Sequence, residues 1–440
     1  MGSVPAVAEV QVELAERPDD SPLRCAFVPL SENDLVRRLT ALAKPERTVF
    51  DATRGHLADA VAFQPCVRYN SQDRFTVRQL DVHGKKWTFT GVFDGHLGDA
   101  TVEHAAHHLP IIVQEVLDKL VPTPDAPLPA PDIVSDMLAS RITAFDNAIA
   151  GDVLELFPGG IDLLPTRTDE EIQAVVNDFA SLSGSSNGTA GANYKKARLC
   201  LYGTTALVAL VDPTHENLWV ANLGDCEAVL VTPDPDGRLP RHEVLNVLHN
   251  GSNAAEIARV RRDHPGEPDS VMNGRVLGTI APFRCLGDTP FKQPAIFTRR
   301  VLYNLYPGVA DPTPWETFLA RNRTPPYISS VPDVVHRRLG PRSLLILATD
   351  GLSELYDGAG RADMVADWAL CVAEAEARVG ARAKVGSTEE KEGLGEGENL
   401  ALRLLRRALG GEDLMSISQM ITLDMETPWM DDTTIIVQVL

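Results

Sequence analysis

Three strongly apolar segments of this chain have an aspartate at one end, and no other feature constrains the fold as much. They are Trp87–Phe93 before Asp94, Ser343–Thr349 before Asp350, and Thr433–Leu440 after Asp431. Their aromatic and branched residues are typical of β-strands. Carboxylates at strand ends can meet at one rim of a sheet, where like charges repel strongly unless a cation neutralises them. The pattern therefore predicts a metal site built from strand ends.

Each Asp-Gly pair taken alone is better explained as a turn, because both residues are favoured there for backbone reasons. Asp94-Gly95 and Asp350-Gly351 gain weight only from the apolar strands in front of them. Oxygen ligands without neighbouring cysteine or histidine pairs suit Mg²⁺ or Mn²⁺ rather than zinc. We therefore expect hard divalent cations if the carboxylates converge.

Net charge, cysteine spacing and the lengths of apolar runs limit the classes of binding partner and the compartment that we expect. The 440 residues carry a formal net charge of -20, which disfavours nucleic acid and anionic membrane surfaces as partners. The six cysteines are scattered without metal-ligand spacing, and we expect them to be reduced residues of the core. We find no apolar run long enough to span a membrane and no cationic leader. The expectation is a cytoplasmic protein without integral membrane association; the oligomeric state stays open.

Periodicity and turn signals outline the remaining elements. Helices are expected over 105–120, interrupted or kinked at Pro110, and over 132–150, 363–378 and 400–409. Strands are expected over 203–211 and 218–222, joined as a hairpin by a turn at Asp212-Pro213. Strands and helices mix without strict βαβ alternation, which favours an α+β fold over a doubly wound sheet.

Five ordered motifs resemble the metal-dependent type 2C protein phosphatases. They are Gly91–His96, Gly203–Ala206, Val220–Asp225, Leu347–Gly351 and Asp431–Thr434. Together they are highly specific, although each alone is weak. The stretches Asn273–Asp288 and Thr324–Tyr327 are similar to the pyruvate dehydrogenase phosphatase branch of this family.

The resemblance implies a fold and a domain plan. The fold is a four-layer α-β-β-α sandwich of two antiparallel sheets flanked by helices, with the metals at one end between the sheets. Residues 1–47 would form an N-terminal extension, and 48–440 the catalytic domain. A flexible insert is expected around 181–193 and a charged linker around 386–398.

The resemblance also implies the metal ligands, which are carboxylates and one backbone carbonyl. They are Asp94 bridging two ions, the carbonyl of Gly95, Asp350, Asp431 and Asp73, with Asp225 and Glu354 at a weaker third ion. Gln72 departs from the family, which usually has a glutamate there, so the second ion is expected to bind more weakly. Leu97 and Cys226 also depart, at positions that supply no ligand.

Two further residues are candidates for catalysis. His96 follows the metal-binding Asp-Gly and resembles the family's general acid; the alternative is a histidine that only caps the next helix. Arg68 lies five residues before Asp73, where many relatives place a phosphate-binding arginine. A simple surface arginine is an equally good interpretation of Arg68.

The predicted function is hydrolysis of phosphoserine and phosphothreonine in proteins by a water activated between two cations, Mn²⁺ or Mg²⁺. One alternative is a catalytically weak or inactive phosphoprotein-binding pseudophosphatase, for which Gln72 is the only support. Another is a hydrolase of small phosphoesters, since the same centre would attack either ester. The branch resemblance makes mitochondria the alternative compartment.

Overall fold

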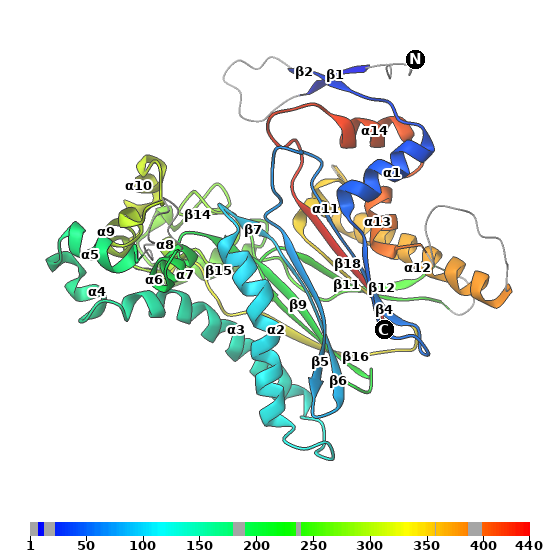
Figure 1. Cartoon of the computed structure of the whole chain (residues 1–440), viewed down its shortest axis with the longest axis horizontal. Helices are drawn as coiled ribbons and strands as arrows, with labels where there is room; N and C mark the ends of the chain where they lie inside the picture. The colour runs from blue at the N-terminus through cyan, green and yellow to red at the C-terminus, as the bar shows by residue number, and fades with distance from the viewer. Residues whose placement is uncertain (1–7, 13–22, 179–189, 235–238, 357, 386–397) are drawn as a thin grey trace, which may run out of the picture. The chain divides into compact units, whose positions relative to one another are not determined.

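The computed structural model describes residues 8–12, 23–178, 190–234, 239–356, 358–385 and 398–440, and side chains within 25–378 and 398–440 of these ranges. The chain divides into two compact units, each assembled from separate stretches of sequence (Figure 1). Unit 1 comprises Met1–Val77, Glu227–Leu245 and Leu339–Leu440. Unit 2 comprises Arg78–Cys226 and Asn246–Arg338.

Unit 1 is built on a six-stranded antiparallel sheet with the order β12-β11-β17-β18-β4-β3. The strands are β3 (Glu46–Asp51), β4 (His56–Phe63), β11 (Glu227–Thr232), β12 (Arg241–Val244), β17 (Leu344–Ala348) and β18 (Thr433–Val439). A separate antiparallel pair consists of β1 (Ala8–Val12) and β2 (Leu23–Phe27). The central strands β17 and β18 are almost wholly buried, and β17 is entirely apolar.

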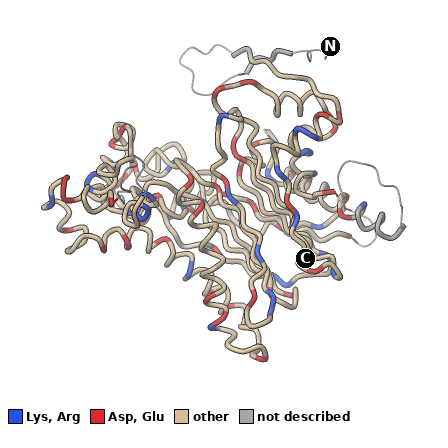
Figure 2. Tube along the Cα trace, viewed as in Figure 1, with Lys and Arg blue, Asp and Glu red and all other residues tan. Residues whose placement is uncertain are grey.

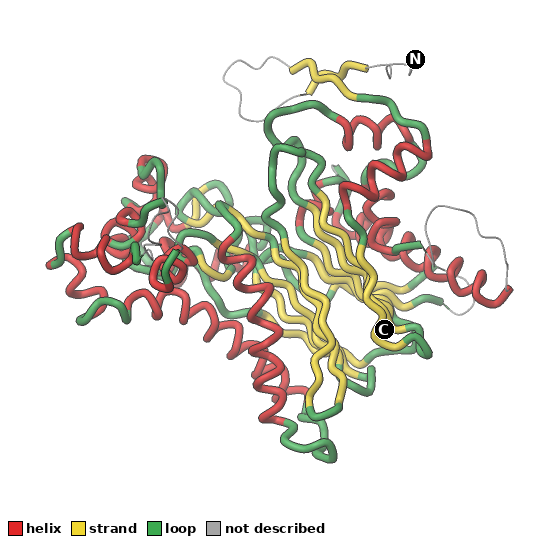
Figure 3. The backbone as a smooth tube through the Cα atoms, viewed as in Figure 1, coloured by secondary structure: helices red, strands yellow, loops and turns green. Residues whose placement is uncertain are grey.

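Five helices accompany this sheet, and Figure 3 shows α12 and α13 lying along it. They are α1 (Glu32–Ala43), α11 (Asp350–Glu354), α12 (Arg361–Val385), α13 (Leu400–Ala408) and α14 (Leu414–Thr422). The α1 helix begins at Ser31, whose side chain accepts a hydrogen bond from the Asp34 amide. Leu35 and Leu39 of α1 pack with Trp368 of α12 in the core of unit 1.

Unit 2 contains a five-stranded sheet with the order β16-β10-β9-β6-β5. The strands are β5 (Arg74–Val82), whose first residues lie in unit 1, β6 (Lys85–Phe93), β9 (Ala206–Val211), β10 (Asn217–Leu223) and β16 (Asp333–Arg338). A small second sheet, of order β15-β8-β7, joins β7 (Gly95–His96), β8 (Gly203–Thr204) and β15 (Leu286–Gly287). A two-stranded ribbon adds β13 (Val271–Met272) and β14 (Arg275–Val276).

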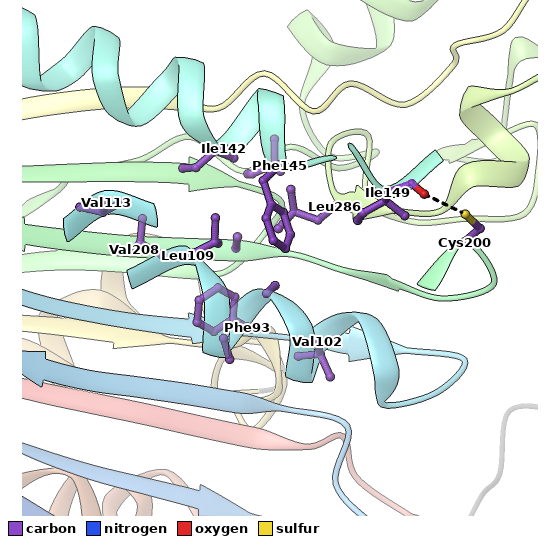
Figure 4. Packing of buried hydrophobic residues seen from close by; sticks show 14 of the residues in the cluster. Phe93, Val102, Leu109, Val113, Ile142, Phe145, Ile149, Cys200, Val208 and Leu286 are labelled. Atoms are coloured by element: carbon purple, nitrogen blue, oxygen red, sulfur yellow. Dashed lines mark hydrogen bonds between the residues drawn. The ribbon is translucent and has the colours of Figure 1, made fainter. Parts of the chain in front are cut away.

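Two long helices, α2 (Ala100–Leu120) and α3 (Pro131–Leu154), pack on the larger sheet of unit 2. The shorter helices are α4 (Gly160–Leu163), η1 (Leu164–Thr166), α5 (Asp169–Val176), α6 (Ala192–Leu199), α7 (Ala254–Asp263), η2 (Pro268–Ser270), α8 (Thr289–Lys292), α9 (Ala295–Arg300), η3 (Leu302–Asn304) and α10 (Thr313–Leu319). Leu109 and Phe145 bring the two long helices into one core with Phe93 (Figure 4). The Cys200 thiol donates to the Ile149 carbonyl at 3.4 Å in the same region.

The predicted elements are confirmed with small changes of boundary. The apolar segments predicted next to Asp94, Asp350 and Asp431 form β6, β17 and β18, and the predicted hairpin is β9 paired antiparallel with β10. The interruption expected at Pro110 is wrong, because α2 continues from Ala100 to Leu120. Proline removes one helical hydrogen bond, but Leu109, Pro110 and Val113 are all buried. Burial of this apolar face outweighs the local preference.

The antiparallel sheets with helices expected from the fold class are confirmed within each unit. All six cysteines are buried thiols without disulfides, as expected. The domain boundaries stay a prediction. Residues 181–189 of the proposed insert and 386–397 of the proposed linker lie outside the described residues, whereas Ala192 and Asn193 of the insert begin α6. No helix among the described residues combines the length and apolarity needed to cross a bilayer. Acidic and basic residues are interspersed along the chain of both units (Figure 2).

Candidate metal centre

Three carboxylates of unit 1 come together at the ends of its two central strands. Asp350 and Glu354 lie on α11, directly after β17, and Asp431 lies just before β18. One ligand oxygen from each lies within 4.8 Å of the other two. Because β17 and β18 are antiparallel neighbours, the end of one meets the start of the other. The pairing of β17 with β18 therefore brings Asp350 and Asp431 together, and α11 adds Glu354.

Gly351 is required for this approach. A Cβ atom at this position would lie 2.1 Å from the carbonyl oxygen of Asp432, so a side chain there would push the two segments apart. Thr349 closes the junction, since its amide donates to the Thr434 carbonyl at 3.0 Å and its hydroxyl accepts from the Thr434 amide at 2.9 Å. The Asp-Gly pair is thus more than a turn; it brings the start of β18 against the end of β17.

Asp73 adds a buried carboxylate to unit 1. It precedes β5 and accepts a hydrogen bond from the Thr349 hydroxyl at 2.7 Å. Burial raises the pKa of Asp73 to about 8, against the lowering effect of the Thr349 hydrogen bond, and the charges of Asp432 and Asp431 raise it further. A carboxylate in this position is costly to ionise without a cation.

Asp432 is a residue that the sequence analysis missed. Its two carboxylate oxygens accept hydrogen bonds from the Gln72 amide at 2.6 Å and the Gln64 side chain at 2.9 Å. It is buried, whereas its neighbour Asp431 is exposed. Asp432 therefore ties the segment containing Gln72 and Asp73 to the start of β18. The doubled aspartate in the sequence was the available signal, because the two residues of such a pair point in different directions.

The side-chain amide of Gln72 provides a test of whether this region fits a cation. Its nitrogen donates to the Tyr69 hydroxyl at 2.5 Å, whereas its oxygen Oε1 is buried and has no hydrogen-bond partner among the described residues. Buried amide oxygens normally have a partner, and a cation or its bound water would supply one. The residues of unit 1 therefore offer an all-oxygen environment that fits a hard divalent cation.

The motif residues of unit 2 are joined by the small sheet β15-β8-β7. The Asp94 carbonyl accepts hydrogen bonds from the Thr205 amide at 2.8 Å and the Thr204 hydroxyl at 2.9 Å. Gly95 and His96 pair with Thr204 and Gly203. Two motifs that are more than 100 residues apart are therefore direct hydrogen-bonding neighbours. This pairing fixes the backbone on both sides of the Asp94 carboxylate.

Asp94 and Asp225 form the carboxylate pair of unit 2. Ligand oxygens of the two residues lie within 4.8 Å of each other. Burial raises the pKa of Asp225, while the hydrogen bond from Asn250, 3.1 Å long, lowers it. Asp225 directly follows β10 and Gly224, a glycine with a φ of 127°. The two carboxylates fit a cation for the same reason as those of unit 1.

His96 of unit 2 contacts a carboxylate that sequence reasoning did not single out. Its Nε2 lies 2.8 Å from Oδ2 of Asp288, whose side chain is 1% exposed. Asp288 is the last residue of the stretch Asn273–Asp288, but only the fold brings it next to His96, which lies 192 positions earlier. Arg68 lies elsewhere, in unit 1, where its exposed guanidinium is 3.5 Å from the exposed Glu426. The proposed role of Arg68 stays a prediction.

The comparisons with known proteins agree with the motif resemblance. The model of the family described as Protein phosphatase 2C matches residues 163–380. The human mitochondrial pyruvate dehydrogenase phosphatase 2 is 32% identical over 264 residues, which are 53% of this chain and 47% of that protein. The human mitochondrial pyruvate dehydrogenase phosphatase 1 is 33% identical over 266 residues, which are 56% of this chain and 49% of that protein.

A fungal relative extends the similarity further along the chain. The mitochondrial pyruvate dehydrogenase phosphatase 1 of Saccharomyces cerevisiae is 28% identical over 383 residues, which are 79% of this chain and 61% of that protein. The chain spans about half the length of the human relatives that it matches.

Proposed function

Because the chain belongs to the protein phosphatase 2C family, in its pyruvate dehydrogenase phosphatase-like branch, we propose that it hydrolyses phosphoserine and phosphothreonine in proteins. The observation that carries this proposal is the gathering of carboxylates at the family motifs. In unit 1 these are Asp350, Glu354 and Asp431, and in unit 2 Asp94 and Asp225. Carboxylates this close repel one another, and a bound cation is one way to compensate their charge.

Two divalent cations, Mn²⁺ or Mg²⁺, are the proposed cofactors, with a weaker third. The family pattern assigns the Asp94 carboxylate to both ions and the Gly95 carbonyl to one of them. Asp350 and Asp431 complete one shell, Asp73 belongs to the other, and Asp225 and Glu354 to the third. When bound, such cations lower the pKa of a water molecule and polarise the phosphoryl oxygens. The all-oxygen donors around Asp73 and Asp431 support hard ions over zinc.

The remaining roles fall to cationic side chains. His96 is the proposed general acid, which gives a proton to the serine or threonine oxygen as the ester bond breaks. Arg68 is the proposed phosphate-binding residue, since a guanidinium can hold two phosphate oxygens at once. Arg68 is 55% exposed and pairs with Glu426, which is itself 92% exposed, so Arg68 can change partner at little cost.

The test is phosphate release from a phosphothreonine peptide with Mn²⁺, with Mg²⁺ and with a chelator. We expect metal-dependent release by the wild type, and its collapse in Asp350→Asn. Circular dichroism confirms that both proteins are folded. A folded wild type that stays inactive at millimolar Mn²⁺ and Mg²⁺ contradicts the proposal and favours the phosphoprotein-binding alternative.

Substrate size separates the protein phosphatase from a hydrolase of small phosphoesters. We expect kcat/KM for a phosphopeptide to exceed that for a small alkyl phosphate, because a peptide has additional groups that bind the enzyme. Equal values for both substrates would favour the small-phosphoester alternative. The names of the relatives point to phosphorylated pyruvate dehydrogenase as the first protein substrate to assay.

The same names give mitochondria as the compartment of the relatives, which is the alternative to the cytoplasm in the sequence analysis. Fractionation of cells that express the native gene decides between the two. Recovery with matrix markers would support the mitochondrial alternative, and recovery with cytosolic markers the first expectation.

A further inference from the structure

The contact between His96 and Asp288 has the geometry of an imidazole held by an anion. The Nε2 to Oδ2 distance is 2.8 Å, and the same oxygen accepts a hydrogen bond from the Cys285 thiol at 2.9 Å. Asp288 is 1% exposed, whereas the His96 side chain is 26% exposed. An ionised carboxylate can only accept hydrogen bonds, so Nε2 of His96 is the donor. The ring proton that remains available for transfer to a substrate is then the one on Nδ1.

The backbone is shaped to allow this contact. Asp288 has a φ of 48° and a ψ of 41°, a left-handed conformation that a residue with a side chain seldom adopts. Gly203 lies against the pair: a Cβ there would be 2.0 Å from Oδ2 of Asp288 and 2.5 Å from Nε2 of His96. The glycine of the Gly203–Ala206 motif therefore leaves the space in which the two side chains meet. Conformations of this kind persist mostly where function requires them.

The surrounding charges leave Asp288 to act on His96. The nearby Lys292 ammonium is held 2.8 Å from both oxygens of Asp146 and 2.7 Å from the Cys285 carbonyl. Because Asp146 compensates Lys292, the negative charge of Asp288 is not consumed by that lysine.

We propose that Asp288 is a positioning residue that orients the His96 ring and holds its Nε2 proton, so that Nδ1 donates to the leaving oxygen. The inference rests on the proposed phosphatase function. In the step concerned, oxygen from water bonds to phosphorus and the phosphorus–oxygen bond to serine or threonine breaks. The Nδ1 proton of the His96 imidazolium passes to that leaving oxygen, and solvent returns a proton to the ring. No redox change or additional reactant is involved.

The test compares two substrates that differ in their need for an acid. The alkoxide of threonine is a poor leaving group and needs a proton, whereas the nitrophenolate of p-nitrophenyl phosphate leaves without one. We expect Asp288→Asn to lower kcat for a phosphothreonine peptide about 100-fold, the low end of general-acid contributions. Turnover of p-nitrophenyl phosphate should change less than about 3-fold, and His96→Gln should show the same selectivity. The double variant should be no worse than either single one.

Asp333→Asn is the matched control, because Asp333 also holds a buried histidine, His249, at 3.0 Å in unit 2. It should change both substrates by the same factor. Equal losses on the two substrates in Asp288→Asn, with circular dichroism unchanged, would overturn the proposal and leave Asp288 a structural residue. A wild type that hydrolyses neither substrate with Mn²⁺ would overturn the proposed function and this inference with it.

A second measurement on the wild type does not depend on any variant folding. Nitrogen-15 shifts of the folded chain identify which nitrogen of the His96 ring carries the proton once the ring is neutral. We expect the proton on Nε2, facing Asp288. A neutral ring protonated on Nδ1 alone would contradict the proposed orientation, whatever the kinetics of Asp288→Asn.

Discussion

Asp73 of unit 1 and Asp288 of unit 2 are equally buried, at 3% and 1% exposure, yet their environments act on them in opposite directions. Burial raises the pKa of Asp73 to about 8, and the charges of Asp432 and Asp431 add to the effect. Burial also raises the pKa of Asp288, but the charge and hydrogen bond of His96 outweigh it and lower the pKa. One carboxylate is surrounded by like charges, and the other has its own cation within the fold.

The difference shows how to separate a carboxylate that needs a bound cation from one whose charge the fold itself compensates. A buried carboxylate without an internal cation must obtain one from outside or take up a proton. Asp73, among further carboxylates and one amide oxygen without a partner, is of the first kind. Asp288 is of the second kind, and so is Asp146, which pairs with Lys292. Variants that remove a charge, or the partner of a charge, at either kind of site test this comparison.

The largest effect is expected from Asp350→Asn, which removes a charge from the group of unit 1. Phosphate release should fall on the order of 1,000-fold or more, because a bound cation contributes several kcal/mol to the transition state. Without metal, the same variant should unfold at an equal or higher temperature, since one repelling charge is gone. Steady-state kinetics and metal-free thermal melts measure the two effects. A lower metal-free melting temperature would show that Asp350 is structurally compensated, like Asp288.

Lys292→Met tests the compensated kind of charge. It leaves Asp146, which is 5% exposed in its side chain, buried without its ammonium partner. We expect the free energy of unfolding to fall by about 3 kcal/mol, as for other buried pairs that lose one member. Denaturant titration measures this change.

The control for Lys292→Met is Lys196→Met, because Lys196 pairs with Asp152 at 3.3 Å on the surface of the same unit. Its loss should be below about 1 kcal/mol, since solvent screens the exposed pair. Equal losses in the two variants would mean that burial of the Lys292 pair has little energetic consequence.

Added Mn²⁺ should stabilise the folded chain through the carboxylates that the proposed function assigns to the cations. At about 100 times the dissociation constant, the gain in free energy of unfolding is about 2.7 kcal/mol. Asp288→Asn should keep this gain, whereas Asp350→Asn should lose most of it. Thermal melts over a Mn²⁺ series measure the three proteins side by side. Loss of the gain in Asp288→Asn would mean that Asp288 acts on the ions and not on His96.

Local sequence reveals the proposed cation ligands more readily than it reveals carboxylates such as Asp288, whose charge the fold compensates. Asp94, Asp350 and Asp431 are visible in the sequence because each lies at the end of an apolar strand, a pattern that a short stretch of sequence carries. The Asp288 contact with His96 spans 192 residues and depends on a left-handed backbone and on Gly203, none of which a strand or helix pattern encodes. The same limit explains the wrong expectation at Pro110, where burial of α2 overrides the local rule.

Gln72→Glu gives the smallest expected effects, and it is the sharpest test of whether the oxygen atoms around Asp73 bind a cation. The buried Oε1 of Gln72 has no partner among the described residues, and a carboxylate there would add a full charge to the ligands. We expect the dissociation constant of the second Mn²⁺ ion, the one assigned to Asp73, to fall about 10-fold, because affinity follows the number of charged ligands. Metal-free stability should fall by about 1 kcal/mol, since the new charge is next to Asp73 and close to Asp432.

Gln64→Glu is the control that makes this prediction specific. Gln64 also contacts Asp432, but both of its amide atoms are used: Oε1 accepts from the Cys66 amide at 3.0 Å and Nε2 donates to Asp432 at 2.9 Å. A glutamate there should destabilise the metal-free chain without tightening Mn²⁺, because the lost donor is structural. Calorimetric titration with Mn²⁺ measures both variants. If Gln72→Glu destabilises the chain but leaves the Mn²⁺ affinity unchanged, Oε1 does not face an ion, and the cation is held by the aspartates alone.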